Sequence, residues 1–482
     1  MNAARLRVLL KVGFLLAVVV VLPAGSVFRM LRQNRLDAAL IQAIQQKRTA
    51  PALALLTEGA DPDACVTESP ASFWEMLQQH WVRMRGKTAP PQNGDSALML
   101  AVQTDQEPVT LALLKRGATG VNAQVDVQDS YSFYPLLLAA TAKGRMETAT
   151  ALLDKGADIN ARGTDEQTAL LIALSESPSS ASGTSAEKAV SQNLAHSRFA
   201  LAHLFVERGA DVNAQNKRTG ETPLLNAAGA NQTALVQLLL DKGADTNPLD
   251  TSDSYDCWSP LDWAAYYNNV GMVKNLLDKG AAVNPTEAQG DPPLLATCDA
   301  DVMRLLLDRG AKIEARRTRG KHGGSTALID VSSTEEIDAM RLLLNRGANV
   351  NAADDYGETA LSEAALYSDA PILRLLLRRG ARVNDSDNDR TTALMWAASD
   401  GNDENCEVLI AGGARVNLSN GERETALMLA ADNGDDSVIE TLLDGGAAIN
   451  LRDKHGRTAL DHAIENDNTA VIAQLKRMGG RR

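Results

Sequence analysis

The stretch GETALSEAALYSDAPILRLLLRRGARVN, residues 357–384, contains the pattern that decides the fold. The hydroxyl of Thr359 suits a helix N-cap, where it accepts a hydrogen bond from a free backbone N–H. Leu373, Leu376 and Leu377 recur at helical spacing and predict the buried stripe of a second helix. Gly380 stands where this helix should end, in a left-handed conformation that costs glycine little. The stretch therefore predicts two short helices followed by a glycine stop.

The same pattern returns along most of the chain. Gly-Ala recurs every 33 residues at Gly347, Gly380, Gly413 and Gly446, and Gly479 lies one more period on. Earlier copies begin at Gly59, Gly117, Gly156, Gly209, Gly243, Gly280 and Gly310. A period of this length indicates stacked supersecondary units, each of which buries its apolar faces only against its neighbours.

The units resemble ankyrin repeats, in which Thr-Pro-Leu-His, Ala-Ala, Leu-Leu and Gly-Ala-Asp-Val-Asn-Ala follow in this order. Twelve units fit between about Leu36 and Arg482. The resemblance implies an all-α, ankyrin-repeat solenoid of about twelve helix-turn-helix units with short β-hairpin fingers. The family's His is replaced throughout, for example by Asp262, Met395 and Asp461, which removes a hydrogen bond expected in the family.

Irregular spacing predicts two insertions, at residues 65–92 and 175–197. The distance between successive Gly-Ala pairs grows to 58 and to 53 residues across them. The first insertion predicts an amphipathic helix that packs on the first repeats or lies on a membrane surface. The second predicts a Ser-rich exposed loop, followed by a long second helix at residues 186–207.

One unit is shorter than the others. Only 30 residues separate Gly280 from Gly310, and Asp-Pro-Pro-Leu at residues 291–294 replaces the usual opening. We therefore expect an abbreviated first helix in this unit.

The N-terminus predicts a hydrophobic helix that precedes the repeats. Residues 8–28 contain one charge, Lys11, and are long enough to cross a bilayer. We expect residues 1–35 to form a signal anchor and residues 36–482 to form an exported, membrane-tethered repeat domain. The small residues Ala24, Gly25 and Ser26 make a cleaved signal peptide, with a secreted or periplasmic repeat domain, one alternative. Basic residues flank the span on both sides and leave its orientation open, so a cytoplasmic repeat domain is another.

Composition argues against several classes of function. The chain carries a net charge of −13, and an acidic solenoid repels the phosphates of nucleic acid. Four cysteines and six histidines show no metal-ligand or redox spacing. His455 and His462 are expected at the solvated surface. We therefore predict no catalytic site, no metal and no cofactor.

The predicted function is protein binding through the concave face formed by the fingers and the first helices. Tyrosine and tryptophan are favoured interface anchors, and aromatic residues make up only 4% of this chain. Several nevertheless fall on exposed positions of this face, together with one acidic residue. The candidate partner-binding residues are Tyr131, Phe133, Tyr255, Trp258, Tyr266, Tyr267, Tyr356, Tyr367 and Asp400. A regulatory or inhibitory subunit of an enzyme or toxin is the alternative, and an enzyme with a site in an insertion is a further one.

Overall fold

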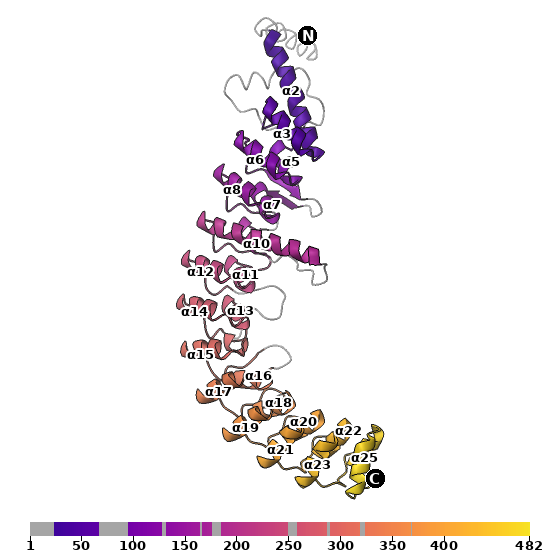
Figure 1. Cartoon of the computed structure of the whole chain (residues 1–482). Helices are drawn as coiled ribbons and strands as arrows, with labels where there is room; N and C mark the ends of the chain where they lie inside the picture. Colours follow the sequence, from indigo (N-terminus) through magenta and orange to yellow (C-terminus); the bar gives the residue numbers. More distant parts are fainter. Residues whose placement is uncertain are drawn as a thin grey trace, which may run out of the picture. The chain divides into compact units, whose positions relative to one another are not determined.

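The computed structural model describes residues 24–66, 95–127, 132–163, 166–175, 185–248, 258–286, 290–318, 323–367 and 369–482. The chain divides into two bodies, Met1–Arg218 and Thr219–Arg482. In both, short helices follow one another in antiparallel pairs (Figure 1). We call each pair a repeat and the loop that joins one pair to the next a finger.

The N-terminal body contains four helix pairs among its described residues. They are α2 (Ala24–Gln45) with α3 (Thr49–Glu58), α5 (Ala97–Gln103) with α6 (Glu107–Lys115), α7 (Leu136–Ala142) with α8 (Met146–Asp154), and α9 (Ala169–Leu174) with α10 (Ser185–Glu207). One finger forms an antiparallel hairpin of β1 (Gln124–Val127) and β2 (Ser132–Pro135), in which Val125 lies opposite Tyr134.

The C-terminal body contains eight pairs among its described residues. They are α11 (Pro223–Gly229) with α12 (Thr233–Asp241), α13 (Pro260–Tyr266) with α14 (Val270–Asp278), η2 (Pro293–Leu295) with α15 (Ala300–Asp308), α16 (Ala327–Ser332) with α17 (Ile337–Asn345), α18 (Ala360–Tyr367) with α19 (Ala370–Arg378), α20 (Ala393–Asp400) with α21 (Asp403–Ala411), α22 (Ala426–Asn433) with α23 (Asp436–Asp444), and α24 (Ala459–Glu465) with α25 (Thr469–Arg477). The described part of the chain thus holds the twelve repeats predicted from the sequence, in an all-α repeat solenoid.

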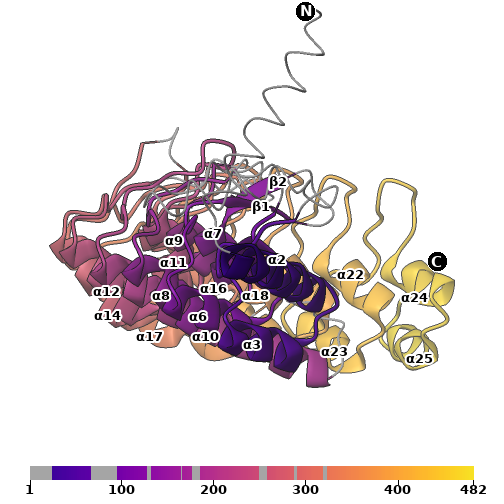
Figure 2. The same cartoon turned by 90° about the horizontal axis from the view of Figure 1, so that it is seen from above.

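The repeats of the C-terminal body stack in two rows. Each first helix contacts the first helix of the next repeat, from α11 through η2 to α24. The second helices occupy the other side of the array (Figure 1). Fingers project together from the helices, as the loops before α22 and α24 show (Figure 2). We call the surface made by the fingers and first helices of this body the finger face.

Local structure follows the repeated residues. The hydroxyl of Thr392 accepts a hydrogen bond from the backbone of Met395 at the start of α20. Gly380 has a φ of +91°, so the glycine after α19 is in the left-handed region. Within α19, Leu373 and Leu376 are fully buried. Isolated β-bridges close several fingers at the capping residue, as between Ser386 and Thr392.

An asparagine ladder joins successive repeats. The side chain of Asn384 donates to the carbonyl of Gly413 at 3.2 Å and accepts from the backbone of Arg415 at 2.7 Å. Asn417 and Asn450 make the same two bonds to the repeats that follow them. The asparagine that follows each Gly-Ala pair therefore bonds to the glycine that ends the second helix of the next repeat. This bond explains why the asparagine and the glycine recur together.

Aspartate compensates for the missing family histidine in two repeats. Asp262 with Ser259, and Asp461 with Thr458, form reciprocal capping boxes at the starts of α13 and α24. The expected loss of a local hydrogen bond is therefore offset at these two positions.

The insertions are described only in part. Most of residues 65–92, including the predicted amphipathic helix, and the Ser-rich loop at 176–184 lie outside the described residues. The expected long helix of the second insertion is α10, which extends over 23 residues. Arg198 of α10 donates to the carbonyl of Ala142 at 2.6 Å, so the lengthened helix is held against α7.

Two further predictions concern the shortened repeat and the N-terminus. The abbreviated first helix is confirmed, because only the single 3-10 turn η2 forms there. Residues 8–23 of the predicted anchor lie outside the described residues, and α2 runs without a break across position 35. Among the helices that the structure describes, none combines the length and the apolar character needed to cross a membrane.

Candidate functional site

The predicted binding residues fall into three groups. Tyr131 and Tyr255 lie outside the described residues, and Phe133 is placed only as a backbone position of β2. Trp258, Tyr266 and Tyr267 lie together around α13. Tyr356, Tyr367 and Asp400 lie further along the same body, in the finger before α18 and at the ends of α18 and α20.

Four rings pack together at α13, and we call Trp258, Trp263, Tyr266 and Tyr267 the aromatic cluster. The ring of Trp258 lies 4.5 Å from that of Trp263 and 5.2 Å from that of Tyr266 between centroids. Tyr266 meets Tyr267 edge to face at 5.3 Å. Edge-to-face and tilted arrangements are favourable for aromatic pairs, so the rings hold one another in place.

The aromatic cluster is anchored on the preceding repeat. The hydroxyl of Tyr267 donates to the carbonyl of Gly229 at 2.8 Å. A Cβ atom at Gly229 would lie 3.6 Å from the Trp263 ring, which shows how closely this ring approaches α11. Trp263 therefore packs between repeats, whereas Tyr266 remains 56% exposed.

Exposed aromatic side chains are a distinctive property of the finger face. Tyr266, Tyr356 and Tyr367 are each more than half exposed. Tyr267 and Tyr367 occupy the same position in their repeats, two residues after the alanine pair, and Asp400 is the exposed residue at this position in α20. Tyrosine at such positions offers area to a partner together with a hydroxyl group that remains hydrated.

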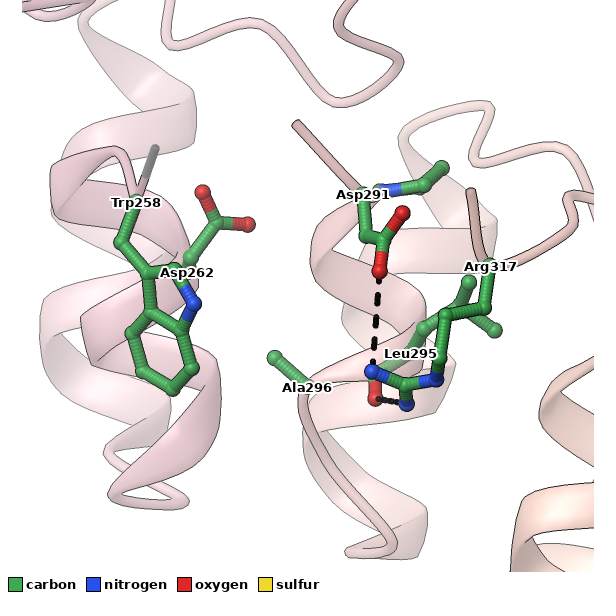
Figure 3. A pocket seen from close by; sticks show the side chains of 7 residues that line it. Trp258, Asp262, Asp291, Leu295, Ala296 and Arg317 are labelled. Carbon is green, nitrogen blue, oxygen red and sulfur yellow. Dashed lines mark hydrogen bonds and ion pairs between the residues drawn. The ribbon is translucent and has the colours of Figure 1, made fainter. Parts of the chain in front are cut away.

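A pocket opens beside the aromatic cluster, where η2 replaces a full first helix. It has a volume of about 440 Å³, counting the open space at its mouth. It is lined by Trp258, Asp262, Asp291, Pro292, Leu295, Ala296 and Arg317. Figure 3 shows Trp258 and Asp262 on one wall and Asp291 and Arg317 on the other, with the Asp262 carboxylate directed into the space between them. The shortened repeat therefore creates a recess in the finger face.

Asp262 is a buried carboxylate with one satisfied oxygen. Its Oδ2 accepts hydrogen bonds from the backbone nitrogen and the hydroxyl of Ser259, each at 2.7 Å. Its Oδ1 is buried and has no hydrogen-bond partner. Burial, with a smaller contribution from the nearby charge of Asp291, raises the pKa of Asp262 to about 6, against the opposing effect of the Ser259 bonds.

Arg317 is held tightly on the opposite wall. Its guanidinium donates to the carbonyl of Leu295 and to Asp330 at 2.9 Å each, and lies 3.6 Å from Asp291. Asp330 accepts a further hydrogen bond from Ser325. The positive charge of Arg317 is therefore matched by carboxylates that do not include Asp262.

Acidic groups continue along the finger face to α18. Burial, together with the neighbouring Glu358, Asp354 and Asp330, raises the pKa of Glu363 to about 7. Close carboxylates resist simultaneous ionisation, and a positively charged partner relieves their repulsion. This stretch of the face is therefore suited to basic rather than acidic ligands.

The histidine prediction was half right. His455 is exposed, but His462 is buried, because its ring fits between the last two repeats. Its Nδ1 lies 2.9 Å from Asp432, and its Nε2 lies 3.3 Å from Asp453. The hydrogen bond to Asp432 raises the pKa of His462, despite the opposing effect of burial.

Glu424, Asp453 and His462 bring possible metal-ligand atoms within 4.8 Å of one another. Arg457, however, already pairs with Asp453 at 2.8 Å and approaches Glu424 at 3.9 Å. Although burial opposes ionisation of Asp453, hydrogen bonds from Arg457 and His455 hold its pKa at about 2. The group is thus an internally compensated ion-pair network that fastens the last repeat.

Sequence reasoning missed Asp262, Arg317 and Asp330 as functional residues. For Asp330 alone, the available signal was the fifth position of each repeat, counted from the capping Ser or Thr; Asp262 is at the fourth position and Arg317 lies in a finger. In the C-terminal body this position carries Asn226, Trp263, Asp330, Glu363, Trp396, Leu429 and His462, so its chemistry differs from repeat to repeat.

Comparisons with known proteins agree with this architecture. A family model that describes three consecutive ankyrin repeats matches the chain at residues 40–163, 189–287, 294–387, 337–420 and 394–479. The chain is similar to Ankyrin repeat and SOCS box protein 6 of Pongo abelii and of Homo sapiens, with 30% identity over 156 residues in each. The match covers 29% of this chain and 32% of each relative, so it spans about a third of their length. The family match over most of the chain, on twelve described helix pairs, shows that this protein belongs to the ankyrin repeat family.

Proposed function

We propose that this protein is a binding scaffold whose protein partner docks on the finger face between α13 and α20. The observation that carries the proposal is the exposure of Tyr266, Tyr267, Tyr356 and Tyr367 on this one face. Among the described residues, all exposed aromatic side chains of the C-terminal body lie here. Large exposed apolar groups cost solubility, and their concentration on one surface is typical of an interaction site.

Family membership supports the same reading. Ankyrin repeats are generally non-enzymatic scaffolds, and each repeat here adds surface to a continuous face. A partner with a basic surface is favoured by the acidic residues of this face, which are Asp262, Asp291, Glu358 and Glu363. Complementary charge steers the two proteins together and fixes how their surfaces align. A regulatory or inhibitory subunit would use the same face, and only the identity of the partner separates it from a plain scaffold.

We extend the proposal to the N-terminus. The apolar run at residues 8–28 would tether the scaffold to a membrane, with the repeat domain exported. Protease added to intact cells should then digest the repeats while leaving the tether protected. Full protection of the repeats in intact cells, with digestion only after the membrane is opened, would place them on the inner side.

The docking proposal is tested by affinity capture of the full chain from intact membranes, followed by mass spectrometry. The variant Tyr266→Ala/Tyr267→Ala should reduce recovery of a specific partner by about tenfold or more, since buried tyrosine anchors contribute on the order of 2 kcal/mol each. Met478→Ala, which truncates a side chain 56% exposed at the far end of the array, is the matched control. Equal recovery with the double variant and the control would remove this surface from the proposal.

A further inference from the structure

We propose that the pocket beside the aromatic cluster receives one basic side chain, arginine or lysine, of the protein partner. The inference rests on the proposed docking face and names the chemistry that this face recognises. The pocket lies on the finger face, because Trp258 belongs both to the aromatic cluster and to the pocket wall. A partner that covers Tyr266 can therefore place a side chain in the pocket.

The first argument is the unpaired oxygen of Asp262. This residue is only 6% exposed, and its Oδ1 has no hydrogen-bond donor. A buried carboxylate oxygen without a partner is costly, and a charged donor compensates for it better than a neutral one. Asn at this position would keep the Ser259 capping box and avoid the buried charge, so the capping role alone does not require Asp.

The second argument is the charge balance of the pocket. Two carboxylates, Asp262 and Asp291, face one guanidinium, Arg317, which leaves one negative charge uncompensated. Asp330 adds another negative charge behind Arg317. An entering ammonium or guanidinium group neutralises this excess, whereas an acidic side chain would face two carboxylates.

The third argument is the aromatic wall. Trp258 is half-buried, and its ring is fixed by Trp263 at 4.5 Å and by Tyr266 at 5.2 Å. A cation near a tryptophan ring is attracted by the negative face of the π-system. A tryptophan ring beside the Asp262 carboxylate on one wall, with Asp291 on the other, therefore suits a long basic side chain, whose apolar stem packs on the ring.

The pocket can be tested without knowing the partner. The full chain contains five tryptophans, so labelling with 5-fluorotryptophan gives a small ¹⁹F spectrum, and Trp258→Phe assigns the pocket signal. The probes are N-acetyl-arginine amide, N-acetyl-lysine amide and N-acetyl-citrulline amide, the last being a neutral analogue of the first. We expect a saturable shift of the Trp258 signal with the arginine or lysine probe, and at least tenfold weaker binding of citrulline.

Two variants distinguish the effect of the Asp262 charge on probe binding from an effect of the capping position on folding. Asp262→Asn should weaken binding of the basic probe at least tenfold. Asp461→Asn changes the same capping position in the last repeat, away from the pocket, and should leave probe binding unchanged. Equal binding of citrulline and arginine, or unchanged binding to Asp262→Asn, would overturn the inference, as would tighter binding of N-acetyl-glutamate amide.

The outcomes distinguish this inference from the docking proposal. If Tyr266→Ala/Tyr267→Ala abolishes partner capture but no basic probe shifts Trp258, the pocket inference fails and the docking face stands. If the basic probes bind as expected but the tyrosine variant captures the partner normally, the docking face fails and the pocket remains a cation site.

Discussion

Asp262 caps its own helix through Ser259 with one oxygen, keeps the other buried without a hydrogen-bond partner, and lines a pocket. The two bonds from Ser259 are each 2.7 Å long and both end on Oδ2. Asp262 therefore stabilises the start of α13 through one carboxylate oxygen, while its other oxygen has no hydrogen-bond donor. A buried carboxylate with an unpaired oxygen lowers the stability of the fold, and binding can offset this loss. Asp262 is therefore central to our account.

The first prediction is that Asp262→Asn stabilises the protein at pH 7.5. The folded-state pKa of about 6 lies above the ordinary value of 3.8, so ionisation opposes folding. The difference corresponds to roughly 2–3 kcal/mol at about 1.4 kcal/mol per pKa unit. Urea unfolding should show the variant more stable at pH 7.5. The gain should shrink as the pH falls through 6 and disappear below 3.8, where Asp262 is protonated in both states.

Asp461→Asn is the control for this measurement. Asp461 makes the same capping box, but its other oxygen is paired with Arg482 at 3.0 Å. Its folded-state pKa is lowered: burial opposes the shift, and bonds from Thr458 and Arg482 outweigh that effect. Asparagine should therefore give no gain here, and a gain equal to that of Asp262→Asn would show that the unpaired oxygen is not the cause.

The second prediction concerns the asparagine ladder. Asn384→Ala removes the bonds to Gly413 and Arg415 and should cost about 1–3 kcal/mol in urea unfolding, at roughly 0.5–1.5 kcal/mol per hydrogen bond. Asn384→Asp keeps the acceptor for Arg415 but loses the donor to Gly413, so its loss should be intermediate. Equal stability of wild type and Asn384→Ala would mean that the ladder does not couple the repeats.

The third prediction is a pH-dependent last repeat. Asp432 raises the pKa of His462 in the folded state above its unfolded-state pKa near 6.5. The protonated side chain therefore stabilises the fold fully at pH values below 6.5, and this stabilisation is lost as the pH rises through the folded-state pKa. Asp432, Asp453 and Arg457 are the charged groups that set this pKa. The melting temperature of His462→Gln should therefore fall further below that of wild type at pH 6 than at pH 8.5.

The exposed His455 provides the control for the last repeat. His455→Gln changes the same residue type in the neighbouring finger and should leave the melting temperature unchanged at both pH values. A pH-independent difference between wild type and His462→Gln would contradict a protonated, ion-paired His462.

Much of the fold could be predicted from local signals. The glycine stops, the capping threonines and the leucine stripe each act within one repeat, so the twelve pairs were predictable without tertiary information. The abbreviated helix at η2 was also predictable, because Pro292 and Pro293 together with the three missing residues leave too little chain for a full helix.

The site was less accessible, because it depends on contacts between repeats. Tyr266 and Tyr367 were identified as exposed from their positions alone. His462 was placed wrongly, since its carboxylate partners lie in α22 and in a finger, 30 and 9 residues away. Asp262 was noted only as a substitute for the family histidine. Its place in a pocket depends on the recess left by η2, which no single repeat reveals.

The most direct test of the central claim is the dissociation constant of the captured partner for the wild type and for Tyr266→Ala/Tyr267→Ala. Both proteins should have the same helical circular dichroism, because Tyr266 and Tyr267 lie at the exposed end of α13 and the substitution removes only one hydrogen bond between repeats, that of Tyr267 to Gly229. Our account predicts at least tenfold weaker binding by the double variant, with Met478→Ala binding as wild type does. Equal dissociation constants for all three proteins would contradict the claim that the finger face binds the partner.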